Sequence, residues 1–315
     1  MKASALHVTN GDSVIYTFRK AGLTGEHLAW ADVLHEGPVP DGLALEQLSA
    51  IRAQYLTERG FGSAIKINHQ FAKRDALLRR ARDFDEVVLW FEHDLYDQLQ
   101  LLQLLISVEA LELPYGHVQL IQSDQYLGMM TADELMALHP KRRSITAALN
   151  SAADRAWRAF TAEEPTGLAA FRGAEVPGLP HLRNAIARLC EEFPSFHTGL
   201  SRTERQILES IAQGARRNED IFKRASSREE ALFMGDTSFF RFLEDMAIGT
   251  APLVVALDDG YDLTVLGRRV LTGDADWREE AQPRERWVGG VRLTRENDWR
   301  WDEARERFVN KSETA

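Results

Sequence analysis

A cluster of ionisable residues near position 92 is the strongest chemical signal in the sequence. Glu92, His93 and Asp94 are consecutive, and Asp97 and Gln98 follow within one helical turn. Carboxylates held close together raise one another's pKa toward neutrality and can act as general acids or bases. Carboxylates together with an imidazole can also hold a divalent cation such as zinc or manganese. The cluster therefore predicts metal binding by Glu92, His93 and Asp94, or acid–base chemistry.

Three further polar segments each follow an apolar run, as the 92–98 cluster does. They are Asn10-Gly11-Asp12-Ser13, the group Asp32, His35 and Glu36, and Ser123-Asp124-Gln125. Together with the 92–98 cluster they carry seven carboxylates and no lysine or arginine. Such a rim repels a bare phosphate but attracts a divalent cation, a cationic substrate, or a phosphate carried with its metal. The predicted ligand is therefore a small polar or phosphorylated molecule, with a divalent metal as the cofactor.

The chemistry of these side chains suggests a role for each. The predicted catalytic residues are Asp12, Ser13, Asp32, His93 and Asp94. The predicted ligand-binding residues are Asn10, Gly11, Glu36, Asp97 and Gln98. Metal-assisted hydrolysis, including that of a phosphoester, is the reaction class that this set favours. The alternative for any single residue is a helix cap or a solvated loop charge, because Asp and Ser are preferred in the first turn of a helix.

Alternating apolar runs and amphipathic stretches indicate the elements that must position these residues. Strands are expected at 5–9, 27–34, 86–91 and 117–121, and helices through residue 19 and over 45–59, 68–83 and 97–111. This alternation predicts an α/β fold with a doubly wound, mostly parallel sheet. The carboxyl ends of parallel strands meet at one edge of a sheet. We therefore expect one pocket to collect Asp12, Asp32, Glu92, His93, Asp94 and Asp97.

The sequence pattern changes beyond residue 130. The α/β unit is expected over 1–130, a mostly helical connecting segment over 131–196, a third unit over 197–275, and a tryptophan-rich hairpin and tail over 276–315. In the third unit, helices precede a small expected hairpin, which predicts a winged-helix-like domain. In the tail, residues 287–293 are expected to pair with residues 299–301.

Other known patterns match only in part. Gly11-Asp12-Ser13 is similar to the turn of the Gly-Asp-Ser hydrolases, and Asp32 and His35 have the Asp-x-x-His spacing of that class. In that class, however, the Asp-x-x-His pair lies near the end of the chain. The single glycine of the turn does not make the dinucleotide fingerprint Gly-x-Gly-x-x-Gly. His7, in the middle of a strand, is expected to be a buried, hydrogen-bonded histidine.

Three stretches of the N-terminal third together resemble a known family. They contain His-x-x-x-Gly-Asp-Ser from His7, Asp-x-x-x-x-Gly-Pro from Asp32, and Trp-x-x-x-Asp-x-x-Asp-Gln from Trp90. Over about residues 5–125 the chain resembles the bacterial domain-of-unknown-function family eighteen thirty-five. This resemblance implies a bacterial cytoplasmic source and supplies no catalytic residue. Residues 200–208 and 263–271 resemble the helical core and the closing helix of winged-helix regulators.

The charge balance restricts the expected partners. The 38 basic and 48 acidic residues give a formal net charge of −10, which argues against binding nucleic acid or an anionic membrane by bulk charge. Residues 198–273 carry ten basic and twelve acidic residues, whereas a DNA-binding domain is usually basic. A transcription regulator that reads DNA through the third unit remains the main alternative. A partner-binding protein, including a homodimer formed through the tryptophan-rich tail, is another.

Cysteine usage and the start of the sequence indicate a compartment. Cys190 is the one cysteine, so an intrachain disulfide and a multi-cysteine metal centre are excluded. The first residues lead directly into an expected strand, without an apolar stretch long enough for export or for crossing a membrane. A cytoplasmic location and no membrane partner are therefore expected.

Overall fold

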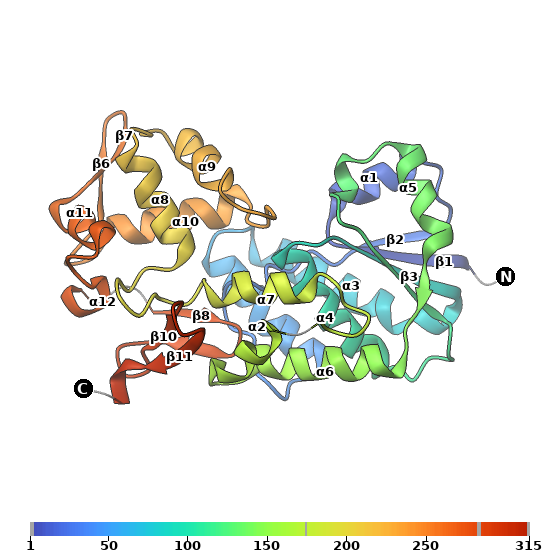
Figure 1. Ribbon diagram of the computed structural model, residues 1–315. Helices are drawn as coiled ribbons and strands as arrows, with labels where there is room; N and C mark the ends of the chain where they lie inside the picture. Colours follow the sequence, from blue (N-terminus) through green and yellow to red (C-terminus); the bar gives the residue numbers. More distant parts are fainter. Residues whose placement is uncertain (1–2, 174, 282–284, 314–315) are drawn as a thin grey trace.

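The computed structural model describes residues 3–173, 175–281 and 285–313 (Figure 1). The main sheet has five strands in the order β2-β1-β3-β4-β5. Its strands are β1 (Ala3–Thr9), β2 (Glu26–Ala29), β3 (Phe84–Phe91), β4 (Val118–Gln122) and β5 (Arg143–Ser144). The first four are parallel, and β5 is antiparallel to β4. The expected α/β class with a mostly parallel sheet is therefore confirmed.

Helices cover both faces of the sheet (Figure 1). Side chains alternate along β3, so Val88 and Trp90 pack on one face while Val87, Leu89 and Phe91 pack on the other. The first face is covered by α1 (Asp12–Lys20) and α5 (Ala132–Leu138), the second by α4 (Leu95–Glu109) and α6 (Ala147–Thr161). Burial on both faces explains why β3 is a nearly continuous apolar run.

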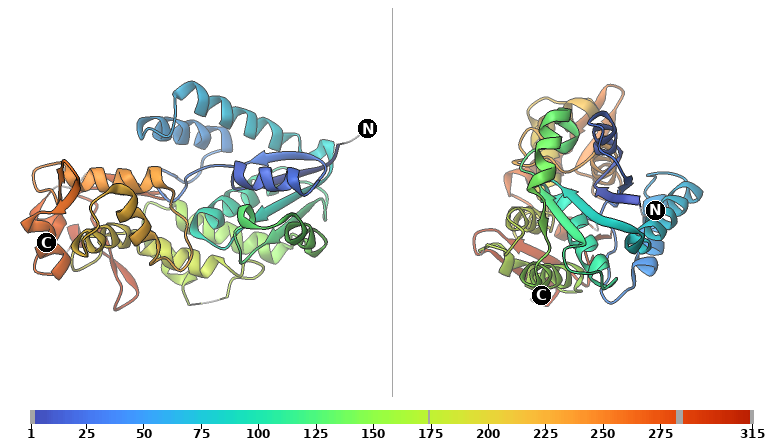
Figure 2. Two further views of the ribbon diagram at one scale, coloured as in Figure 1. Left: turned by 90° about the horizontal axis from the view of Figure 1, so that it is seen from above. Right: turned by 90° about the vertical axis from the view of Figure 1, so that its right-hand side faces the viewer.

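Two long helices lie beside the outer strand β2. They are α2 (Leu45–Glu58) and α3 (Ala64–Arg79), which lie side by side in Figure 2.

His7 on β1 is buried, and its Nε2 donates a hydrogen bond of 3.1 Å to the carbonyl oxygen of Thr24. Trp90 donates its indole N–H to His7 Nδ1 at 3.2 Å. The expectation that His7 is a buried, hydrogen-bonded residue is confirmed.

The second strand ends earlier than expected. A strand was expected over residues 27–34, but β2 ends at Ala29. The N–H groups of Trp30 and Ala31 still donate to the carbonyl oxygens of Thr9 and Asn10. Ala31 has a left-handed backbone with φ of 50°, which is uncommon for a residue other than glycine and turns the chain. Asp32 therefore lies beyond the strand, in a loop that passes over α2 and α3.

The segment 131–196 is mostly helical, as expected, but it also completes the sheet. The short edge strand β5, which was not expected, lies between α5 and α6. Two residues are too few to give a recognisable alternation in the sequence. After α6, the chain forms the 3-10 helix η4 (Pro165–Phe171) and then α7 (Leu182–Cys190), which packs against α4.

Beyond residue 200, the part that the structure describes contains five α-helices and three small antiparallel sheets. The helices are α8 (Arg202–Ala212), α9 (Asn218–Ser226), α10 (Asp236–Ala247), α11 (Val265–Thr272) and α12 (Trp277–Glu280). Strands β6 (Val254–Leu257) and β7 (Gly260–Leu263) form a hairpin between α10 and α11. None of the helices in the described ranges is long and apolar enough to span a membrane.

The pairing expected in the tail is wrong. Residues 287–293 do not pair with 299–301; instead β8 (Arg286–Val288) pairs with β9 (Val291–Leu293), and β10 (Trp299–Asp302) pairs with β11 (Arg307–Asn310). Gly289 and Gly290 form the turn of the first hairpin, and Gly289 has a φ of 59°. A Cβ on Gly290 would come within 1.8 Å of the Thr161 carbonyl oxygen. This two-glycine turn splits what reads in the sequence as one strand.

Candidate functional site

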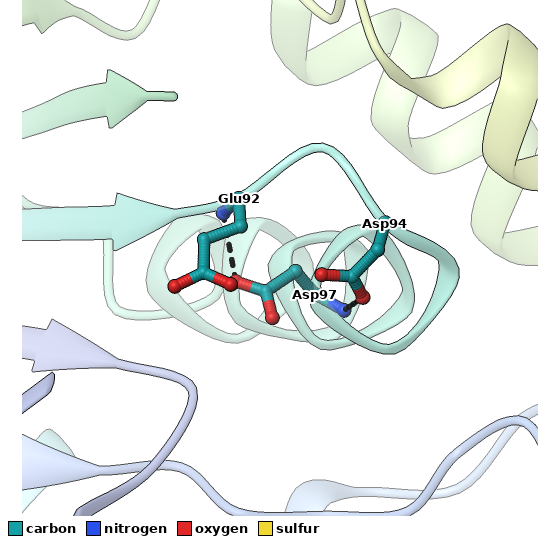
Figure 3. Close-up of side chains that lie close together, drawn as sticks. All are labelled: Glu92, Asp94 and Asp97. Atoms are coloured by element: carbon teal, nitrogen blue, oxygen red, sulfur yellow. Dashed lines mark hydrogen bonds between the residues drawn. The ribbon is translucent and has the colours of Figure 1, made fainter. Parts of the chain in front are cut away.

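Three carboxylates gather where the sheet meets the first turn of α4. Glu92 follows the last residue of β3, Asp94 is the N-cap of α4, and Asp97 is on its first turn (Figure 3). One oxygen from each lies within 4.8 Å of the others, and all three side chains are buried. We call Glu92, Asp94 and Asp97 the acidic cluster. It lies beside the carboxyl ends of β1 and β3, where the strand order reverses and α/β sheets bind their ligands.

Short hydrogen bonds fix the cluster in place. The backbone N–H of Glu92 donates to Asp97 Oδ1 at 2.7 Å, and the N–H of Asp97 donates to Asp94 Oδ1 at 3.1 Å (Figure 3). From the end of β1, Asn10 Nδ2 donates to Asp97 Oδ2 at 2.6 Å. Gln98 Nε2 donates to the Glu92 carbonyl oxygen at 2.6 Å. These bonds hold the carboxylates in one geometry without neutralising them.

The cluster carries more negative charge than its surroundings compensate. Burial, and then the charge of Asp94, raise the pKa of Glu92 to about 7. Burial raises the pKa of Asp94 to about 6, although backbone N–H groups oppose the shift. Burial and the charges of Asp94 and Glu92 raise the pKa of Asp97 well above its usual range. No lysine or arginine in the described ranges forms an ion pair with any of the three.

Neutral oxygen acceptors beside the cluster also lack partners. Asn10 Oδ1 and Gln98 Oε1 are buried, and neither receives a hydrogen bond from the residues that the structure describes. Each belongs to an amide whose nitrogen is bound to the cluster region, at Asp97 Oδ2 and at the Glu92 carbonyl oxygen. Carboxylate and amide oxygens are the ligands that hard divalent cations prefer. The cluster, with Asn10, could therefore hold such a cation.

His93 is not part of this oxygen set. Its ring faces Tyr126, with centroids 5.1 Å apart, and His181, with centroids 6.1 Å apart. Burial lowers the pKa of His93, so the ring is neutral at pH 7. The side chains of consecutive residues at the end of β3 point in different directions. The side chain of Asp97 lies next to that of Asp94 because the two residues are one helical turn apart on α4. The structure thus joins Glu92 and Asp94 to Asp97 rather than to His93.

A cavity of about 430 Å³ adjoins the cluster. It is bounded by His93, Asp94 and Asp124 from the sheet edge and by His181 and Asn184 at the start of α7. Its volume is in the range of small-molecule sites. Asp94 contributes to both the cluster and the cavity wall, so a molecule in this cavity would reach the cluster through Asp94.

The turn after β1 contributes one residue to the cluster by hydrogen bonding. Gly11 is the N-cap of α1, and Asp12 and Ser13 are exposed on its first turn. No hydrogen bond among the described residues links Asp12 or Ser13 to the acidic cluster, whereas Asn10 makes one. Because α1 begins at Asp12, the chain has already turned along the other face of the sheet at this point.

Asp32 forms buried ion pairs with two arginines. Its Oδ1 accepts a hydrogen bond of 3.0 Å from Arg52 Nε on α2, and Oδ2 lies 3.8 Å from Arg74 Nη1 on α3. All three side chains are buried. The Asp32 carboxylate therefore has cationic partners from α2 and α3, which the acidic cluster lacks in the described ranges. That Asp32 shares one pocket with the cluster stays a prediction.

Glu36 is also engaged elsewhere. It accepts a hydrogen bond of 3.0 Å from the Tyr55 hydroxyl and another from the Ser238 hydroxyl on α10.

The position of Arg52 in the sequence indicates that it is a buried ion-pair partner. Arg52 lies four residues from both Leu48 and Leu56, on the buried stripe of α2. A charged residue on such a stripe indicates a buried partner.

Comparisons with known proteins give no family. No family model and no curated protein matches the chain. Among solved structures, it is similar to the DNA-binding, cleavage and re-ligation domain of topoisomerase II from Plasmodium falciparum, with 9% sequence identity and a TM-score of 0.43. The match covers 81% of this chain and 44% of that one, so the chain spans less than half of the structure it matches. A likeness at this level carries no functional information.

Proposed function

We propose that the acidic cluster binds a divalent cation and that the protein uses it to bind, and to hydrolyse, a small polar or phosphorylated molecule. The observation that carries this proposal is the burial of three carboxylates within 4.8 Å of one another without a basic partner in the described part of the chain. A bound cation would supply the missing positive charge. The resemblance of residues 5–125 to family eighteen thirty-five stays a prediction.

Helix capping alone does not account for the cluster. Asp94 caps α4 by accepting from the Asp97 N–H, which explains one carboxylate. Glu92 Oε1 accepts from the Leu127 N–H at 2.7 Å, which explains one oxygen of a second. A cap gains from a charge near the helix N-terminus, but a second and a third buried charge beside it repel the first. Helix capping therefore does not explain why three carboxylates are buried close together.

The surrounding residues suit hydrolysis near the cluster. A bound cation would polarise a substrate oxygen and lower the pKa of a water molecule. Asp94 would orient the reacting group at the cavity wall. His93, neutral at pH 7, can accept a proton from a group in the same cavity. The oxygen-only donor set favours magnesium, manganese or calcium over zinc.

Calorimetric titration of the metal-stripped protein with Mg²⁺ and Mn²⁺ tests the proposal. We expect one site per chain, and a loss of affinity of at least tenfold in Glu92→Gln and in Asp97→Asn. Each amide keeps the shape and removes one charge. Asp133→Asn is the matched control, because Asp133 is exposed in the first turn of α5. Equal affinity in all four proteins, or no binding to the wild type, would contradict a cation site at the cluster.

A second candidate function rests on the element order of the C-terminal half. Helices α8, α9 and α10 followed by the β6–β7 hairpin have the order of a winged-helix module, which we propose as the fold of this unit. In such modules a helix enters the major groove. The corresponding helix here is α10, and its side chains are not free to contact DNA bases. Phe239 and Leu243 are buried, and Arg241 Nε donates to the Arg59 carbonyl oxygen at 2.9 Å.

Two of the basic residues that could contact DNA are also engaged. Arg216 forms an ion pair of 2.7 Å with Asp262, and Arg224 donates to the Gln213 carbonyl oxygen at 2.8 Å. Arg59 of α2's C-cap pairs with Asp245 of α10 at 2.8 Å, which fastens α10 to the α/β part. These contacts favour an enzyme over a DNA-binding regulator.

We expect the full chain to bind duplex DNA no more tightly than about 0.1 mM in physiological salt, at the weak end of non-specific binding. Anisotropy of a labelled duplex measures this. Micromolar binding that is lost on charge reversal of Arg216, Arg217, Lys223 and Arg224 would favour the regulator.

A further inference from the structure

A second cavity, of about 910 Å³, lies at the β4–β5 edge of the sheet. Its walls come from β4, from the segment 141–149, from the segment 175–180 and from the start of α7. Three basic side chains line it: Lys141, Arg143 and Arg183. Glu175 is the one carboxylate among its lining residues. In a chain with a formal net charge of −10, this cavity is locally positive.

The three cations of this basic cavity are not used to stabilise the fold. None of them forms an ion pair or a side-chain hydrogen bond with the residues that the structure describes, and all three are exposed. Their neighbour Arg142 shows the contrast, because it pairs with Glu86 at 3.0 Å. Three like charges around one cavity repel one another, and an anion bound between them removes that repulsion.

The rest of the wall suits an anion as well. The hydroxyls of Ser144 and Thr146 line the cavity and can donate hydrogen bonds. Arg183, the second residue of α7, lines the cavity, and no side chain caps the N-terminus of that helix. Gln122 Nε2 donates to the Gly178 carbonyl oxygen at 2.8 Å, which ties the 175–180 segment to the sheet. Backbone N–H groups at a helix N-terminus favour a bound phosphate.

The basic cavity adjoins the cavity beside the acidic cluster. Asn184 on the first turn of α7 lines both. Gln122, in the basic cavity, is the register partner of Phe91, the residue before Glu92. One molecule could therefore extend from the basic cavity, past Asn184, to the wall formed by Asp94.

We propose that the basic cavity is a phosphate site, and that the substrate is a phosphorylated small molecule of nucleotide size. Lys141, Arg143 and Arg183 hold its phosphate groups, while its reacting group lies beside Asp94 and the cation. The proposal of a phosphate site depends only on the features of the basic cavity. The statement that its ligand is the substrate rests on the proposed function.

ADP and inorganic pyrophosphate are the probes, titrated calorimetrically into the full chain with and without Mg²⁺. We expect the double variant Arg143→Gln/Arg183→Gln to weaken ADP binding in Mg²⁺-free buffer by at least tenfold. Arg155→Gln is the matched control, because Arg155 is an exposed arginine on α6 that lines neither cavity. No ADP or pyrophosphate binding at millimolar concentration, or equal binding by the wild type and the double variant, would overturn the phosphate site.

The Glu92→Gln variant separates the two proposals. If the phosphate site is correct, this variant still binds ADP in Mg²⁺-free buffer, even if the acidic cluster proves to bind no cation. If both are correct, Mg²⁺ tightens ADP binding by the wild type and not by Glu92→Gln. Mg²⁺ that binds the wild type without changing its affinity for ADP would overturn the assignment of one molecule to both cavities.

Discussion

Replacing Asp32 with alanine is expected to lower the free energy of unfolding by about 3–5 kcal/mol, because it leaves buried arginine charges uncompensated. Arg52 and Arg74 are as deeply buried as Asp32 itself. Arg74 keeps a second carboxylate, Asp75, at 2.8 Å, but Arg52 keeps only carbonyl oxygens, at Glu36, Pro38 and Val33. The loss should therefore come mainly from the guanidinium of Arg52.

Urea denaturation of the wild type and Asp32→Ala measures this loss. Asp154→Ala is the control, since Asp154 and Arg158 form a solvent-exposed pair on α6. Such a pair contributes at most about 0.5 kcal/mol. If Asp32→Ala unfolds within 1 kcal/mol of the wild type, roughly the effect of an average surface change, the Asp32 carboxylate is not a structural ion-pair partner. That result would favour the prediction that Asp32 is a catalytic residue.

The parts of the fold that the sequence predicted are those in which the signal is local. The strands β1, β3 and β4 are apolar runs because helices cover both of their faces, and each was expected within two residues of its bounds. The early end of β2 and the two-residue strand β5 were missed. Contacts from elsewhere in the chain act at both places: Asp32, just beyond β2, pairs with Arg52 and Arg74, and β4 provides the pairing edge for β5.

The same distinction applies to the candidate site. Glu92, Asp94 and Asp97 lie within six positions, so one strand end and one helical turn bring them together. Asn10 joins them because parallel strands end at one edge, a rule that needs only the order of the elements. The same rule did not predict that Asp32 pairs with Arg52 and Arg74, because it takes no account of side chains on neighbouring helices. The basic cavity was not predicted, because Arg183 joins Lys141 and Arg143 only through the fold.

The second large effect concerns pH. In metal-free buffer, the wild type is expected to lose stability relative to Glu92→Gln as the pH rises from about 4.5 to above 7. The pKa of Glu92 in the folded chain is raised to about 7 by burial and by Asp94, whereas in the unfolded chain it is near 4.5. Between these values the unfolded chain binds fewer protons than the folded one, so stability falls as the pH rises.

The magnitude at pH 8 should be a few kcal/mol, because each unit of pKa difference corresponds to about 1.4 kcal/mol. The comparison with Glu92→Gln is necessary because other groups act in the opposite direction. Burial lowers the pKa of His7 to about 4 and that of His35 to about 3, so these residues lower stability as the pH falls. They are the same in both proteins and cancel in the difference between the two curves.

Mg²⁺ should reduce this difference if the acidic cluster is a cation site. A cation at one hundred times its wild-type dissociation constant adds about 2.7 kcal/mol to the wild type, and at most about 1.4 kcal/mol to a variant that binds it at least tenfold more weakly. Urea denaturation at pH 5, 6, 7 and 8, with and without Mg²⁺, gives both effects from one series. Parallel curves for the wild type and Glu92→Gln at every pH would mean that Glu92 is ionised without cost in the folded chain. The charge crowding from which the cation site is inferred would then be absent.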